Sequence, residues 1–153
     1  ATIVDFKQGD NPEVTFDLTP VFEGFLKTSI RKFTKESNTS LIIDDSIEIN
    51  ESTETITWQL ITTFDIDITK EGATIIKPEY SSVTPVKKLF VENLSHPDIK
   101  MNIVSLDPPP LELDRRIEGL KRLELNIPSS LVTRGKIDIK IRLKGQKNWR
   151  EGY

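Results

Sequence analysis

The side chains that most often perform catalysis are scarce in this chain. It contains a single histidine, His96, and no cysteine. A Ser-His-Asp triad needs a serine held on a sharp turn, and the G-x-S-x-G pattern that forms such a turn does not occur. His96 precedes Pro97 in a segment typical of a turn, which favours an ordinary surface position. We therefore expect no catalytic residues and a protein that is not an enzyme.

Without cysteine and with one histidine, a metal would have to be bound by oxygen ligands. The segment 65–72 superficially resembles a calcium loop, but Lys70 stands where an EF-hand needs glycine and Ile76 where it needs glutamate. Its alternating aspartates are more typical of the solvated face of a strand. The pair Asp44-Asp45 is predicted to form a turn, with calcium binding as the alternative. No cofactor and no resident metal are predicted.

One group of residues suggests contact with a protein partner. The polar C-terminal segment combines aromatic and basic side chains, and tryptophan and arginine are enriched at binding hot spots. The candidate partner-binding residues are Arg142, Lys144, Lys147, Trp149, Arg150 and Tyr153. The alternative is a tail that folds back over its own domain. Trp58, by contrast, lies in an apolar alternation and is predicted to be in the core.

The charge of the chain is unevenly distributed. Residues 1–80 carry 15 acidic and 7 basic side chains, a net charge of −8, whereas residues 81–153 carry 9 and 14, a net charge of +5. The halves could simply be two solvated faces. They could also attract each other between copies, in a head-to-tail homo-oligomer. A nucleic-acid partner is not expected, because the overall charge of −3 opposes phosphate binding.

The elements that would position these side chains are predicted to be strands. In Lys136–Leu143 four apolar residues alternate with four charged ones, a period of two that only a half-buried strand satisfies. Further strands are expected at 13–18, 25–33, 87–92, 99–103 and 121–127, with 34–40 as a loop and 6–12 as a turn cluster. The alternation at 53–69 is longer than a usual strand and predicts one long strand or a bulge near Ile61-Thr62.

This pattern predicts an all-β, mainly antiparallel protein built as immunoglobulin-like β-sandwiches. The segment 78–85 holds two prolines and coincides with the change of charge sign. It divides the chain into an acidic module over 1–78 and a basic module over 79–153; the alternative is one sandwich over 1–153. No signal peptide and no apolar run long enough to cross a membrane is visible. We expect a virion or cytoplasmic location without membrane insertion.

Two family resemblances can be stated. Residues 88–95, then Ile99, Met101 and Ile103, and the segments 125–128 and 135–139 resemble the immunoglobulin-like modules of the Hydin and major-sperm-protein type. The segment 6–10 followed by 14–18 is similar to the start of immunoglobulin-like N-terminal domains of phage tail and baseplate proteins. Both resemblances imply non-catalytic scaffolding units.

The sequence therefore predicts a structural or assembly protein that acts through protein–protein contacts, with a phage tail, neck or baseplate component as the specific hypothesis. The alternative is a carbohydrate- or calcium-binding β-sandwich module of a larger surface protein. A carbohydrate site in such a fold usually needs several aromatic platforms.

Overall fold

The computed structural model describes residues 1–78 and 87–146, and these residues form β-strands and two short 3-10 helices. The elements are β1 (Thr2–Lys7), β2 (Glu13–Asp17), η1 (Thr19–Phe22), β3 (Leu26–Ser37), β4 (Ser40–Ile49), β5 (Thr55–Thr62), β6 (Asp65–Ile68), β7 (Gly72–Lys77), β8 (Lys87–Asn93), β9 (Asn102–Ser105), β10 (Lys121–Pro128), η2 (Ser129–Leu131) and β11 (Lys136–Gly145). Neither helix in this part of the chain is long and apolar enough to cross a membrane.

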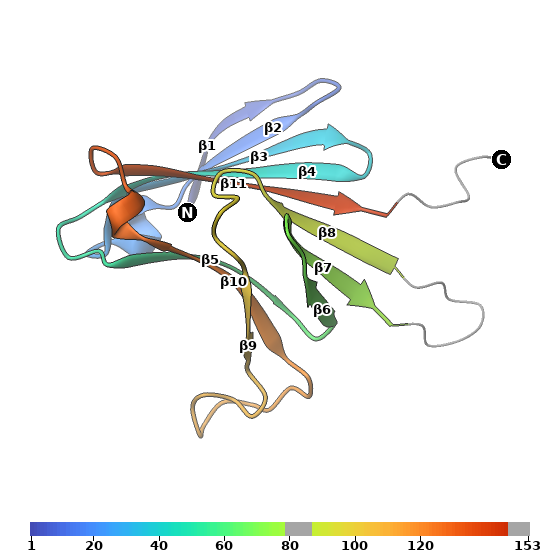
Figure 1. Cartoon of the computed structure of the whole chain (residues 1–153). Coiled ribbons are helices and arrows are strands. Elements are labelled where there is room, and N and C mark those ends of the chain that lie inside the picture. Colours follow the sequence, from blue (N-terminus) through green and yellow to red (C-terminus); the bar gives the residue numbers. More distant parts are fainter. Residues whose placement is uncertain (79–86, 147–153) are drawn as a thin grey trace.

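The strands form an antiparallel β-sandwich, as the alternation predicted. An eight-stranded sheet has the order β1-β2-β3-β4-β11-β8-β7-β6, and a three-stranded sheet has the order β5-β10-β9. Figure 1 shows β1 to β4 fanning out away from β5, β10 and β9. The two sheets are therefore very unequal in width, and the smaller one cannot cover the whole face of the larger one.

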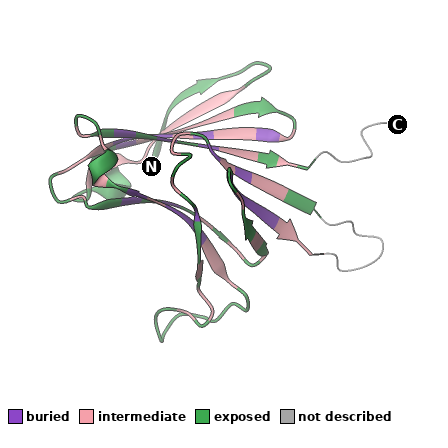
Figure 2. Cartoon of the chain, viewed as in Figure 1, coloured by how far each residue is buried: buried purple, intermediate pink, exposed green. Residues whose placement is uncertain are grey.

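The core lies between the three-stranded sheet and the middle of the larger sheet. Its buried residues come from β4, β11, β8 and β7 on one side and from β5 and β10 on the other, with Met101 just before β9. Leu123, Leu125 and Ile127 of β10 are fully buried, and so is Ile141 of β11. The purple segments of Figure 2 mark these central strands. Burying such side chains contributes roughly 1.5–3 kcal/mol each, so most of the folding energy is concentrated there.

The strand with the clearest alternation occupies the centre of the larger sheet. Ile137, Ile139 and Ile141 of β11 are buried, and the charged residues between them lie on the other face. Residues of β11 pair with β4 on one side and with β8 on the other. The prediction from the period of two is confirmed.

Strands from both predicted modules share the same sheets. β4 pairs with β11, and β5 pairs with β10, across the segment 79–86. The apolar residues of both halves also belong to one core. In the part of the chain that the structure describes, strands on both sides of the segment 78–85 therefore share two sheets and one core cluster.

Several local predictions differ from the structure. The alternating segment 53–69 contains no bulged long strand: β5 ends at Thr62, and β6 begins at Asp65 in the other sheet. Thr62 Oγ1 accepts a hydrogen bond from the Phe64 amide at 3.0 Å within this crossing. The predicted loop at 34–40 is mostly strand, because β3 extends to Ser37 and β4 begins at Ser40. The turn cluster at 6–12 starts too early, since β1 continues to Lys7.

The first three strands form a wing, which we define as β1, β2 and β3. Among the described residues, β1 and β2 supply no side chain to the core cluster, and β3 supplies only the half-buried Leu26 and Phe33. The side of the wing that continues the core face carries Phe16 and Phe33, whose rings meet edge to face with centroids 5.9 Å apart. The wing therefore has an apolar inner face that is only partly covered.

Candidate functional site

A groove of about 810 Å³ opens between the inner face of β3 and β4 and the strand β5. The groove lies where the wing extends beyond the three-stranded sheet. It exists because the smaller sheet is too narrow to cover the whole inner face of the larger one. Its walls combine aromatic, hydroxyl, amide and charged side chains. A concave site of this size with a few fixed polar groups is typical of small-ligand binding.

An ion pair is fixed in the wall of the groove. Arg31 of β3 and Asp45 of β4 face each other in the strand register. The guanidinium donates from Nε to Oδ1 at 2.6 Å and from Nη2 to Oδ2 at 2.7 Å. These hydrogen bonds raise the pKa of Arg31 above its usual value. The side chain of Asp45 is 7% exposed and that of Arg31 33%, so the pair presents mainly its guanidinium edge to the groove.

Asp45 corrects a prediction. The pair Asp44-Asp45 was expected in a turn, but both residues lie inside the ten-residue strand β4. Asp45 shares the inward phase of Ile43 and Ile47, which are both buried. An aspartate in that phase signals an internal partner, because a buried carboxylate must be paired or hydrogen-bonded. The alternation itself could have indicated the site.

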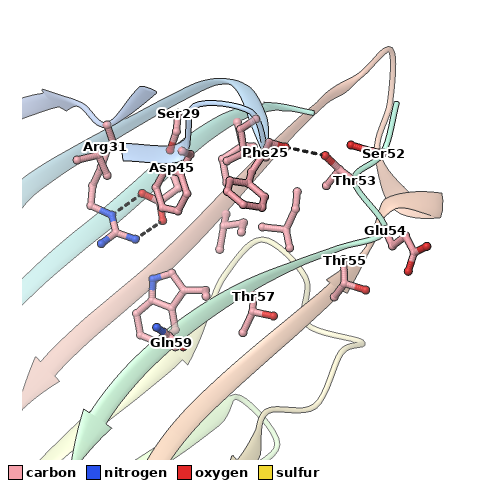
Figure 3. A pocket seen from close by; sticks show the side chains of 17 residues that line it. Phe25, Ser29, Arg31, Asp45, Ser52, Thr53, Glu54, Thr55, Thr57 and Gln59 are labelled. Atoms are coloured by element: carbon pink, nitrogen blue, oxygen red, sulfur yellow. Dashed lines mark hydrogen bonds and ion pairs between the residues drawn. The ribbon is translucent and has the colours of Figure 1, made fainter. Parts of the chain in front are cut away.

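Two phenylalanine side chains from the segment before β3 line the groove. Phe22 ends the helix η1, and Phe25 follows it just before β3. Phe25 is 74% exposed, which is unusual for a ring of this size. Figure 3 shows Phe25, Arg31 and Asp45 along one wall of the groove, with Thr57 and Gln59 of β5 along the other.

The loop that carries Phe25 is held by the loop before β5. Thr53 Oγ1 lies 3.0 Å from the carbonyl oxygen of Phe25, and Asn50 Nδ2 donates to the carbonyl of Gly24 at 3.2 Å. Within the second loop, the Asn50 side-chain oxygen accepts hydrogen bonds from the Ser52 amide at 3.1 Å and the Ser52 hydroxyl at 2.7 Å. These contacts order the mouth of the groove before any ligand arrives, which lowers the entropic cost of binding.

The opposite wall is the outer edge of β5, which is an edge strand of the smaller sheet. Trp58 also lines the groove, although it is only 5% exposed and packs in the core as predicted. Thr55, Thr57 and Gln59 add two hydroxyls and an amide. They alternate along β5 with the buried Ile56 and Trp58, and Thr57 Oγ1 already donates to Asn126 Oδ1 at 2.6 Å. This edge therefore offers a ligand the Gln59 amide, the Thr55 hydroxyl and an acceptor on Thr57.

Of the predicted partner-binding residues, the structure describes Arg142 and Lys144, and neither lines this groove. Arg142 is held by two carboxylates, with its Nη2 2.8 Å from Glu36 Oε1 and its Nη1 2.9 Å from Glu92 Oε2. Lys144 is exposed on β11. Lys147, Trp149, Arg150 and Tyr153 lie outside the described residues. Their role in partner binding stays a prediction.

Other residues singled out in the sequence have ordinary surroundings. His96 is half-buried, with its Nε2 3.0 Å from the carbonyl oxygen of Asp138 and its backbone amide donating to Asn93 Oδ1 at 3.1 Å. Asp65 and Asp67 lie on the exposed side of β6. Among the residues that the structure describes, no group of three or more histidine or carboxylate side chains is placed to hold a metal ion.

Comparison with solved structures finds several similar folds. The chain is similar to a heparan sulfate lyase HepC mutant from Pedobacter heparinus, with a TM-score of 0.63 and 12% identity over 96% of this chain. It is also similar to a heparinase III gene product with methylated lysines, with a TM-score of 0.60 and 11% identity over 98% of this chain. At these identities the similarity shows the fold alone. The match spans 22% of each of those longer chains.

No protein-family model matches the sequence, and no curated protein is significantly similar to it. The β-sandwich is therefore supported, whereas the resemblance to immunoglobulin-like and phage tail modules is not confirmed by these comparisons.

Proposed function

We propose that this chain is a non-catalytic, sugar-binding β-sandwich module that works within a longer polysaccharide-acting protein. The observation that carries the proposal is the groove between β4 and β5, in which aromatic rings stand beside fixed hydrogen-bonding groups. Two of the similar folds belong to a heparan sulfate lyase and a heparinase, in which the matching part is less than a quarter of the chain. Both points favour the carbohydrate-binding alternative drawn from the sequence.

The chemistry of the groove suits a saccharide. A pyranose ring presents C–H groups on its faces and hydroxyls around its rim. Phe25 and Phe22 supply apolar ring surface for the C–H faces. Gln59 and the free edge of the Arg31 guanidinium supply donors for the hydroxyls, and Gln59 and Thr57, whose own hydroxyl donates to Asn126, supply acceptors. The sequence did not reveal these aromatic platforms, which are one phenylalanine at the end of η1 and one in the loop before β3.

The charges of the groove favour an uncharged sugar. Its charged lining residues are Arg31, Asp45 and Glu54. Arg31 is already paired with Asp45, so the lining has no unpaired cation and a net charge of −1. A sulfated chain would gain no new ion pair there and would be repelled by Glu54. We therefore propose a neutral oligosaccharide as the ligand, unlike the heparan sulfate named for the similar lyase.

The virion hypothesis stays a prediction from the sequence. Neither of the two similar structures is described as a virion protein. Calcium binding, the other part of the sequence-based alternative, lacks a cluster of ligands among the described residues. The sugar-binding proposal is therefore preferred to both.

The test is titration of the purified chain with neutral hexasaccharides of glucan, xylan and mannan type and with a heparan sulfate hexasaccharide. Trp58 lines the groove, so its fluorescence reports binding once Trp149 is replaced in a Trp149→Phe background. We expect at least one neutral hexasaccharide to change this fluorescence. Phe25→Ala should raise its dissociation constant about tenfold or more, a loss of about 1.4 kcal/mol or more.

The matched control is Leu113→Ala. Leu113 is 99% exposed and is not among the groove residues, so its removal also deletes exposed apolar surface but should leave the dissociation constant unchanged. The proposal is wrong if no neutral saccharide binds at millimolar concentration, or if Phe25→Ala and Leu113→Ala have equal effects. Binding of the heparan sulfate hexasaccharide alone would overturn the neutral-ligand assignment.

A further inference from the structure

The two edges of the eight-stranded sheet are built differently. At one edge, β6 is four residues long and carries Asp65 and Asp67 on its exposed side. Charges on a short edge strand discourage pairing with another chain. At the other edge, β1 is six residues long and fully exposed, and it contains no proline. Its two charges, Asp5 and Lys7, are of opposite sign, so a strand that presents the opposite charge at each position can still add to this edge.

The exposed side chains of β1 are largely apolar. Ile3 is 60% exposed, Val4 56% and Phe6 59%. The regular pairing of β1 with β2 is interrupted between Ile3 and Asp5, and it resumes through Asp5, Phe6 and Lys7. The outer edge of β1 therefore offers a regular stretch around Phe6, with apolar surface beside it.

The charges around Phe6 select one partner and one register. If a second copy of β1 lies antiparallel with Phe6 opposite Phe6, Asp5 of each copy faces Lys7 of the other. Centring the pair on Asp5 or on Lys7 instead would place like charges opposite each other. Opposite charges facing across antiparallel strands stabilise the pair, as aromatic pairs do, and like charges destabilise it. Only the register centred on Phe6 therefore places Asp5 of each copy opposite Lys7 of the other, which gives two pairs of opposite charges.

We propose that two copies of this chain associate through β1 in an antiparallel, two-fold arrangement. The contact is isologous, because the same patch is used by both copies, and it closes at a dimer. This differs from the head-to-tail assembly that the uneven charge of the sequence suggested. The dimer would extend the larger sheet across the two-fold axis. The apolar inner faces of the two wings would then lie side by side on the same face of the extended sheet. It does not depend on sugar binding.

Sedimentation velocity of the full chain at increasing concentration tests the proposal. We expect the wild type to reach a dimer at concentrations up to about 200 µM, which corresponds to a binding free energy of about −5 kcal/mol or better. Two charge variants then test the register. Asp5→Lys places lysines opposite each other. Lys7→Glu places carboxylates opposite each other, and it is made together with Glu13→Lys, because Lys7 Nζ lies 3.4 Å from Glu13 Oε2 and that ion pair is thus kept in reverse.

Each variant alone should dimerise at least tenfold more weakly than the wild type. A mixture of the two variants should recover the wild-type affinity. In the mixed dimer the lysine introduced at position 5 of one copy faces the glutamate introduced at position 7 of the other, and the remaining native Lys7 faces the native Asp5. Circular dichroism and the melting temperature of each variant show that the fold is intact. A wild type that stays monomeric overturns the proposal, and so does a mixture that associates no better than the separate variants.

Discussion

Arg31 and Asp45 lie directly opposite each other on β3 and β4, at the boundary between the covered and the partly covered parts of the eight-stranded sheet. On one side of this boundary are the buried isoleucines of β4 and β11, and on the other are the half-buried rings of the wing. The ion pair therefore separates the core from the groove, and it stabilises the wall against which a ligand would bind.

Breaking this pair should cost more than removing it. Asp45→Ala leaves Arg31 without its partner in a half-buried site, and we expect a loss of about 2 kcal/mol in the free energy of unfolding, less than for a fully buried pair because Arg31 is partly solvated. Replacing both residues, Arg31→Met with Asp45→Leu, should restore most of the loss. Urea denaturation measures both. Equal losses in the single and the double variant would contradict the account.

The contrast between core and surface leucines gives a second prediction. Leu123 is fully buried in β10, whereas Leu113 is 99% exposed in the loop before it. Leu123→Ala should lower the free energy of unfolding by about 2–5 kcal/mol, because it removes apolar contacts and leaves a cavity. Leu113→Ala should change it by less than about 0.5 kcal/mol. Thermal and urea denaturation measure the loss in each variant. Similar losses in the two variants would show that the core is wrongly assigned.

Glu124 should make stability depend on pH. A hydrogen bond from Asn126 holds its pKa below the usual value, and hydrogen bonds from Asn102 and Arg122 act in the same direction. The ionised side chain therefore stabilises the fold above the unfolded pKa of about 4.5, and this contribution is lost as the pH falls through the lower folded pKa. The wild type should be more stable than Glu124→Gln at pH 7, and the difference should shrink below pH 4.5. A difference in stability between the wild type and Glu124→Gln that grows as the pH falls would contradict this direction of the pKa shift.

Gly72 should not tolerate a side chain. Its φ is +154°, and a Cβ at this position would collide with the backbone carbonyl oxygen of Val91 on β8. Gly72→Ala should destabilise the protein by about 3 kcal/mol, because the neighbouring backbone cannot move aside without breaking the sheet. Gly135 is the matched control: its φ is +74° but nothing lies near its Cβ position, so Gly135→Ala should cost only about 1 kcal/mol. Melting temperatures of both variants provide the comparison.

The sequence predicted those parts of the fold in which the residue pattern of a single strand shows which of its faces is buried. The alternation of β11 identified its buried face, and the same argument placed Trp58 in the core. The segment 53–69 shows the limit of this argument. Its alternating apolar residues occupy even-numbered positions both before and after Thr62. The alternation therefore gives no sign that β5 and β6 belong to different sheets.

The groove depends on relationships that no local pattern contains. Arg31 and Asp45 are fourteen positions apart, so the inward phase of Asp45 indicates a buried carboxylate but does not identify its partner. The strand β1 was not among the predicted strands, because the turn residues that follow it indicated irregular structure in this part of the chain. The width of each sheet, which creates the wing and the groove, follows from pairings between distant strands and not from any single segment.

The position of β11 has a consequence for synthesis on the ribosome. This strand is the last of the described strands to be made, yet it lies between β4 and β8 in the middle of the sheet. Until it emerges, the growing chain holds two separate half-sheets, β1–β4 and β6–β8, whose facing edges have no partner. Folding must then wait for contacts between residues far apart in sequence, which slows the final step and exposes open edges. The nascent protein should therefore be a natural client for chaperones that shield strand edges.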